Sequence, residues 1–449
     1  MKTRLHIVIF ALCSLSAAVF IPLQAQDYLR MTERSLMGTA RYVGMGGAMT
    51  AIGGDPSAVH DNPAALGLYR RAEVLVSLDY SYDRTHQLGE NEYYKRHTFT
   101  VPQASLVLSF SRDKDTDEGV QFNNLLFSYK RTHCYNRTLY GATSTASPSL
   151  GALMETLDVN WDIPFCADPN NSGYDLWLNE SGSVDEFGFD WSMNISNRVY
   201  VGAGINVQAY TLSSKGEYKE TFGHRNGSNE PMYNKNLSSL ILTGAGCDLS
   251  AGVIWRPTGW LRLGLGLQSP TLGTLNTYTN GELWALTDSL RPSYAGDAQN
   301  TDKHFYMPAH IRLSTAFQIG AYGLISLQYD YRGAKYMDAV HALRAGIEVI
   351  PVMGMYINAG YVYESTFANR DLYVAADPNF NRQDTYFLQP KSTQYASFAI
   401  GYRGTYTIVQ AAYQYRWQRT KLFAHENTMP FDMHDDTHRI VLTIGWHRY

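Results

Sequence analysis

The sequence predicts an all-β fold: a transmembrane antiparallel β-barrel of 14 strands, with an N-terminal hatch, or plug, inside the lumen. From Glu73 onward, apolar residues recur at every second position in segments about ten residues long. The number of segments is even, as bacterial barrels require, and short connections largely alternate with long ones. A stretch broken by glycines precedes the first segment.

The chain begins with a predicted export signal. Lys2 and Arg4 precede an apolar run that ends at Leu23, and the small residue Ala25 follows shortly after. This order is typical of a cleavable secretory signal. We therefore expect residues 1–25 to be removed and the mature chain to begin at Gln26.

The stretch from Arg41 to Leu68 is too polar and too rich in glycine to form a strand. Glycine permits backbone angles that are closed to other residues, so a compact irregular segment is predicted here. We expect residues 26–71 to form the hatch and residues 72–449 to form the barrel. A phosphate-binding loop is the alternative, but no Gly-Lys-Ser or Gly-Lys-Thr follows, and the dinucleotide fingerprint fails at Met49.

Each predicted strand has one face fit for lipid and the other fit for water. The predicted strands are 72–83, 98–111, 121–134, 185–196, 199–212, 238–256, 260–269, 309–320, 322–332, 339–350, 353–364, 393–403, 405–417 and 437–449. In the first of them, the predicted outward residues are Val74, Val76, Leu78, Tyr80 and Tyr82. Charged residues that face the lumen need partners, and we expect them to tie the hatch to the wall: Arg262, Arg312, Arg344, Glu348, Asp248 and Asp330.

The connections predict which end of the barrel faces outward. Short turns lie at one end, where we expect both termini, and the other end carries long polar loops: 135–184, 213–237, 270–308, 365–392 and 418–436. In the first loop, Ser147-Pro148 begins a predicted short helix whose apolar residues are Leu150, Leu153, Met154 and Leu157. This apolar face would either receive an apolar solute or pack on neighbouring loops.

Composition agrees with a barrel and excludes some functions. The chain has 33 Tyr and 8 Trp, and aromatic girdles mark both membrane interfaces of such barrels. A net charge of −4 argues against a nucleic-acid partner. Beyond the signal, Cys134, Cys166 and Cys247 are too few and too irregular for a disulfide framework, although a Cys134–Cys166 pair is open.

Two sets of residues could carry chemistry, and in each the structural interpretation is favoured. The acidic turn from Asp113 to Glu118 lacks the glycine and glutamate of an EF-hand. No Gly-x-Ser-x-Gly elbow stands out, so we expect no enzyme activity, catalytic residue, cofactor or metal. One loop could bind a metal or haem, but an ordinary solvated loop is expected; its residues are His425, Glu426, His434, Asp435, Asp436 and His438.

Three stretches resemble the FadL-type outer-membrane transport family, which includes long-chain fatty-acid and aromatic-hydrocarbon channels. They are GMGGAMTAIGGDPSAVHDNPAALG, which contains the Asn62-Pro63-Ala64 signature, GVIWRPTGWLRLGLGLQSPT at 252–271, and the last strand pair ending in Tyr449. The resemblance implies that Asn62 and Pro63 set the turn of the hatch and that Asp55 caps a short helix. The residues assigned to the hatch motif are Gly44, Gly46, Gly47, Asp55, Asn62, Pro63 and Ala64.

The resemblance also implies a function. We expect a monomeric channel, embedded in outer-membrane lipid, that passes hydrophobic small molecules such as fatty acids or aromatic hydrocarbons without energy input. Tyr449 would present the last strand to the barrel assembly machinery. Two alternatives stay open: a FadL-like barrel that binds proteins in a secretion system, and a surface receptor for haem. The residues that hold a fatty-acid carboxylate are not identified by the resemblance.

Overall fold

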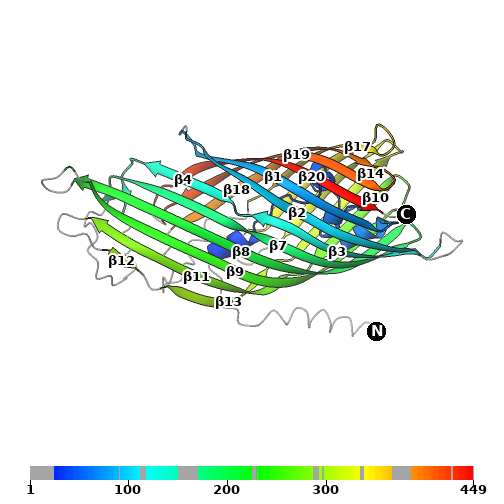
Figure 1. Ribbon diagram of the computed structural model, residues 1–449, viewed down its shortest axis with the longest axis horizontal. Helices are drawn as coiled ribbons and strands as arrows, with labels where there is room; N and C mark the ends of the chain where they lie inside the picture. Colours follow the sequence, from blue (N-terminus) through cyan, green and yellow to red (C-terminus); the bar gives the residue numbers. More distant parts are fainter. Residues whose placement is uncertain are drawn as a thin grey trace.

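The computed structural model describes residues 25–90, 92–111, 118–149, 170–224, 229, 231–286, 293–295, 298–333, 338–366, 386–425 and 428–447. The wall strands are β1 (Glu73–Gln87), β2 (Tyr94–Ser111), β3 (Val120–Cys134), β4 (Arg137–Thr143), β7 (Gly173–Ile195), β8 (Val199–His224), β9 (Pro231–Trp255), β10 (Leu261–Gln268), β11 (Thr271–Leu286), β12 (Ser293–Ala295), β13 (Gln299–Met307), β14 (His310–Ile319), β15 (Gly323–Arg332), β16 (Val340–Val349), β17 (Met355–Glu364), β18 (Phe387–Arg403), β19 (Thr407–Phe423) and β20 (Phe431–His447) (Figure 1). Two short strands, β5 (Ser147–Pro148) and β6 (Asn170–Asn171), form a separate pair.

The sheet closes on itself, because β1 pairs antiparallel with β20 from Glu73↔His447 to Gln87↔Met433. Some of the wall strands follow one another along a single pass. β10 and β11 both pair with β9 and are separated at Ser269-Pro270, where proline cannot donate to the ladder. β13 and β14 are likewise separated at Pro308, and β4 continues β3 against β7. The described strands thus form 14 passes, and the predicted barrel is confirmed.

The short turns lie at one end of the barrel, as predicted. Ser196–Arg198 joins β7 to β8, and Gly320–Tyr322 joins β14 to β15. Ser196 and Asn197 both have a φ of 53°, which allows this tight reversal. The start of β1 and the end of β20 pair at the same end, so both ends of the wall lie there.

The predicted strand lengths are wrong at the other end. β7, β8 and β9 contain 23, 26 and 25 residues, and much of the predicted loops 135–184, 213–237, 270–308 and 418–436 belongs to the wall. By contrast, β15, β16 and β17 have ten residues each. The barrel therefore has a tall side and a short side.

The sequence analysis assigned the upper parts of these strands to loops, because their apolar residues lie on the inner face and not on the outer face. We call the part of the wall next to the short turns the lower section and the part beyond it the upper section. In the lower section of β8, which begins at Val199, Ile205 and Val207 face outward and are exposed, whereas Asn206 and Gln208 face the lumen. In its upper section, from Tyr210 to His224, the outward positions are polar, and the buried inward ones include both apolar and polar side chains: Tyr210, Leu212, Ser214, Tyr218, Glu220 and Phe222. β7 changes in the same way, with Leu176, Leu178 and Val184 inward above Asp190 and Ser192. Without an apolar outer face, such segments look like loops in the sequence.

The predicted helix at Ser147-Pro148 does not begin there. These two residues are extended and pair with Asn171 and Asn170, because β5 and β6 form a ladder. The rest of that helix, from Leu150 to Leu157, lies outside the described residues, as do Cys166, Glu426 and Tyr449. Cys134 and Cys247 are free thiols.

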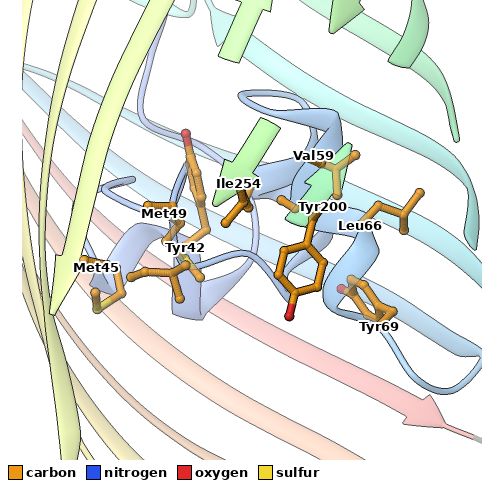
Figure 2. Packing of buried hydrophobic residues seen from close by; sticks show 14 of the residues in the cluster. Tyr42, Met45, Met49, Val59, Leu66, Tyr69, Tyr200 and Ile254 are labelled. Carbon is orange, nitrogen blue, oxygen red and sulfur yellow. The ribbon is translucent and has the colours of Figure 1, made fainter. Parts of the chain in front are cut away.

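Residues 33–72, which we call the inner segment, lie within the barrel. They contain α3 (Ala40–Gly44), α4 (Pro56–Val59) and the 3₁₀ helix η2 (Pro63–Leu68), and α2 (Ala25–Thr32) precedes them. Figure 2 shows how their apolar side chains gather with Tyr200 and Ile254 of the wall. None of the described helices is long and apolar enough to cross a membrane.

Candidate functional site: the barrel interior

The inner segment rests directly on glycines of the wall. A Cβ on Gly252 would come within 1.7 Å of Asn62 Oδ1, and a Cβ on Gly266 would come within 2.2 Å of the Asp61 carbonyl oxygen. A Cβ on Gly360 would come within 2.2 Å of the Gly46 nitrogen. Only glycine allows two backbones to approach so closely. The inward glycines of the strands therefore form a seat for the inner segment.

The glycines of the predicted hatch motif have two different tasks. Gly46 and Gly47 have φ of 61° and 69°, a region in which side chains are strained. Gly44 ends α3, and a Cβ there would lie 2.2 Å from the Ala399 Cβ on the wall. Gly44 thus provides space, whereas Gly46 and Gly47 allow the chain to turn.

Asn62 and Asp55 act as helix caps. The Asn62 Oδ1 accepts from the Ala64 nitrogen at 3.0 Å, which starts η2 with Pro63 in its first turn. The Asn62 Nδ2 also donates to the Thr50 carbonyl oxygen at 2.9 Å. Asp55 accepts from the Ser57 nitrogen at 2.9 Å and from the Thr39 hydroxyl at 2.6 Å. Asp55 thus makes the capping contacts that the resemblance implied, and Asn62, which was expected to set a turn with Pro63, starts a 3₁₀ helix there.

Ion pairs join the inner segment to the wall, as the lumen-facing charges predicted. Arg41 contacts Glu348 at 2.7 Å. Asp61 lies 3.3 Å from Arg312 and 3.8 Å from Arg344, and Arg344 also pairs with a second acid on the wall, Asp330. Burial alone would raise the pKa of Asp61, but Arg312, Lys130 and Arg344 hold that pKa below its ordinary value.

Two of the predicted tying charges behave differently from the rest. Arg262 reaches the inner segment through the Ile52 carbonyl oxygen, to which it donates at 3.1 Å, and so forms a hydrogen bond there. Among the described residues, the hydrogen bonds of Asp248 all run to the wall. Asp248 accepts hydrogen bonds from neutral side chains, which are Asn206, Gln208, Gln268 and Thr271.

A small charged cavity of about 90 Å³ lies beside the inner segment. Its cationic residues outnumber its acids, which are Asp61, Glu186, Asp330 and Glu364. Arg34 donates to the Met31 carbonyl oxygen at 2.8 Å and to Gln208 Oε1 at 2.9 Å, and Lys130 donates to the Ser57 carbonyl oxygen at 3.4 Å. Among the described residues, neither Arg34 nor Lys130 forms a direct ion pair with a carboxylate, although Glu186 acts electrostatically on both and Asp61 acts on Lys130.

The upper section adds apolar layers to the lumen. One buried cluster centres on Met31 of α2 and consists of wall residues otherwise: Tyr135, Val184, Tyr210, Leu212, Leu240, Leu242, Leu275, Phe305 and Met307. A second cluster includes Leu176, Leu178, Tyr218 and Phe431. Most of these wall residues fall in predicted loops. Their signal in the sequence is the same two-residue period with its apolar residues on the inner face.

The described residues of the histidine-rich loop do not gather into one site. His425 is buried against Tyr218, with ring centroids 5.8 Å apart. His434 accepts a contact from Arg419 at 3.0 Å on the outer face, and His438 Nδ1 lies 2.7 Å from the hydroxyl of Tyr413. Asp435 faces the lumen, because alternation along β20 sends neighbouring residues to opposite faces.

Solved structures of transport proteins share this barrel architecture. A FadL homologue from Pseudomonas aeruginosa matches with a TM-score of 0.56 at 14% identity, over 92% of this chain and 98% of its own. The chain has the FadL-type fold. A TodX deltaS2S3 mutant monoaromatic hydrocarbon channel matches this FadL-type barrel with a TM-score of 0.57 at 13% identity, over 92% of this chain and 99% of its own.

A toluene transporter from Ralstonia pickettii, TbuX, matches the FadL-type barrel with a TM-score of 0.52 at 12% identity, over 92% of this chain and 99% of its own. No family model matches the chain, and no curated protein sequence matches it either. The resemblance noted in the sequence is therefore confirmed at the level of the fold.

Proposed function

We propose that this protein is a passive outer-membrane channel for hydrophobic small molecules, with residues 26–71 as its hatch and residues 1–25 as its export signal. The observation that carries this proposal is the inversion of the wall. The lower section is apolar outside, as a lipid environment requires, whereas the upper section is polar outside and carries clusters of buried apolar side chains inside, beside buried polar groups such as Glu180 and Glu220. Such an upper lumen can take an apolar solute from water. The named function of the matched channels, which carry toluene or monoaromatic hydrocarbons, supports this assignment.

Transfer into the upper lumen supplies the driving force. Burial of apolar surface is worth roughly 25 cal/mol per Å². Met31 of α2 occupies one apolar cluster, so the ligand and α2 would compete for the same contacts. Movement of the N-terminal residues would then accompany passage.

The charged cavity favours a fatty acid over a neutral hydrocarbon. A hydrocarbon gains nothing from Arg34 and Lys130, whereas a carboxylate would form charge-assisted hydrogen bonds with them. Several arginines and Lys130 lie below the apolar layers, so a ligand could place its chain in the upper lumen and its acidic end in the cavity. We therefore propose a long-chain acid as the substrate class.

Uptake by cells tests the proposal. Cells that lack the gene and cells that regain it would be given labelled fatty acid or labelled toluene, and the outer membrane would be assayed for the protein. We expect restored uptake of the acid, with a smaller effect on toluene. The double variant Arg34→Ala and Lys130→Ala should lose most of this uptake, whereas Lys235→Ala, which breaks a Lys235–Glu217 pair on the outer face, should not. Equal uptake with and without the gene would refute the channel.

A further inference from the structure

The Asp190 carboxylate on β7 is buried without any donor. The residue has no exposed surface, and neither carboxylate oxygen has a hydrogen-bond partner among the described residues. The charged groups that act on it, Glu186 and Asp248, are acids as well. An ionised carboxylate in such a place is strongly destabilising unless a positive charge accompanies it.

A second orphan oxygen faces the same space. Asn206 on β8 donates through Nδ2 to Asp248 Oδ1 at 2.9 Å, and this contact fixes the amide, since the reverse orientation would set two acceptors against each other. The Asn206 Oδ1 consequently points away from Asp248. It has no hydrogen-bond partner among the described residues, and Asn206 is fully buried.

The orphan oxygens converge in a cradle over two glycines, whose lack of a side chain makes room for them. The point at which a Cβ on Gly188 would lie is 2.8 Å from Ser128 Oγ, 3.3 Å from Asn206 Oδ1 and 3.3 Å from Asp190 Oδ2. A Cβ on Gly204 would lie 2.0 Å from Asp190 Oδ1 and 2.7 Å from Ser250 Oγ.

Strand register explains this convergence. Gly188 is paired with both Ser128 and Asn206, and Asp190 is paired with Gly204. Gly204 is in turn paired with Ser250. All these residues occupy inward positions of four adjacent strands, so the cradle is held by the wall itself.

We propose that Asp190, Asn206 and Ser128, with Ser250, form a calcium site in the wall. The donors are carboxylate, amide and hydroxyl oxygens, which suit a hard cation, and no thiol or imidazole joins the cradle itself. The negative charge of two neighbouring buried acids favours a divalent over a monovalent cation. Asp190 and Asp248 are both buried, Asn206 links them, and the partners of Asp248 are neutral.

The calcium ion would have a structural effect on the inner segment. Ser128 Oγ also lies 3.2 Å from His60 Nε2, and His60 Nδ1 lies 2.6 Å from Glu186 Oε1. The cradle is therefore next to the place where the inner segment meets β3 and β7. A bound ion would neutralise the buried negative charge of the wall at this contact. This effect does not depend on the solute that the barrel carries.

Equilibrium dialysis with labelled calcium tests the site. Full-length protein in detergent would be treated with a chelator, dialysed against calcium at constant ionic strength, and melted with and without the ion. We expect saturable binding of about one ion per chain and a higher Tm with calcium. Asp190→Asn should abolish both effects, and Ser128→Ala, which removes one neutral oxygen, should weaken affinity at least about tenfold.

Asp435→Asn is the matched control, because Asp435 is also a buried, inward acid but bonds to Thr85 and Thr420 on another part of the wall. It should keep calcium binding. Absence of binding by the folded wild-type protein would overturn the proposal, as would equal binding by Asp190→Asn, or displacement of calcium by equimolar sodium. A Tm that rises in Asp190→Asn without any calcium effect would show a protonated carboxylate instead and would also overturn it. If Asp190→Asn fails to fold, unchanged affinity in Ser128→Ala would overturn it as well.

Discussion

The lower and upper sections of the barrel are built from the same strands, but they place their apolar residues on opposite faces. In the lower section of β8, Ile205 faces outward and Asn206 faces the lumen, whereas in the upper section Ser213 faces outward and Leu212 faces the lumen. The register with β9 continues without a break from Val199 to Thr221, and so runs through both sections. The inversion therefore comes from the residue types alone. It shows that the solvent outside each section, together with what each section encloses, decides which face is apolar.

The largest expected effect concerns the polar lumen of the lower section. Asp61→Asn would leave Arg312 and Arg344 short of a buried partner, and breaking a buried ion pair costs about 3–5 kcal/mol. We expect faster hydrogen exchange at the amides of residues 39–68, measured by mass spectrometry. Asp432→Asn, at an exposed outward position of β20, should leave this exchange unchanged. Equal protection in both variants would show that ion pairs do not hold the inner segment.

The outer faces of the two sections should respond differently to one charge. Ile205→Arg places a cation at a position that we assign to lipid and should destabilise the barrel by about 2–4 kcal/mol. Ser213→Arg lies on the same face of the same strand, only higher, and should change stability by less than about 0.5 kcal/mol. Urea titrations of the protein refolded in lipid vesicles measure both values. Similar losses would place the membrane boundary above Ser213.

The inner face of the upper section should control ligand binding. Leu212 and Leu242 are paired across β8 and β9, and the next pair, Thr211 and Thr243, faces outward. Changing both leucines to Asn should weaken binding of a fluorescent fatty acid at least about tenfold, because each leucine contributes about 1.5–3 kcal/mol of apolar burial. Changing both threonines to Asn should have no effect on binding. If the two double variants bind alike, the apolar layer is not the ligand site.

A small effect is also expected from an ion pair on the outer face of the upper section. Arg84 pairs with Asp436 at 2.9 Å, but the Arg84 side chain is 37% exposed. Water screens such a pair, so Arg84→Ala should cost less than about 1 kcal/mol in a urea titration. A loss comparable to that of Asp61→Asn would mean that this face is covered by something other than water.

Local sequence patterns were sufficient for much of this architecture. Two-residue alternation identified the passes and the outward set that includes Val74, Val76 and Leu78, because lipid demands a continuous apolar face. The family resemblance implied a helix cap at Asp55 and a turn at Asn62 and Pro63, and in the structure both Asp55 and Asn62 precede a proline and cap a short helix. The loop boundaries were wrong, because the upper section lacks the outer apolar face on which that prediction depended.

The sequence by itself determined a closed wall with a glycine-rich segment before it, because strand periodicity and backbone freedom are properties of neighbouring residues. Which glycines receive that segment, and which arginines surround Asp61, was decided only by the tertiary structure. Gly252 and Asn62 are far apart in the chain, as are Asp61 and Arg344, and closure of the sheet brings them together. The orphan oxygens of Asp190 and Asn206 meet for the same reason, since strand register, which no local pattern specifies, aligns them on one face.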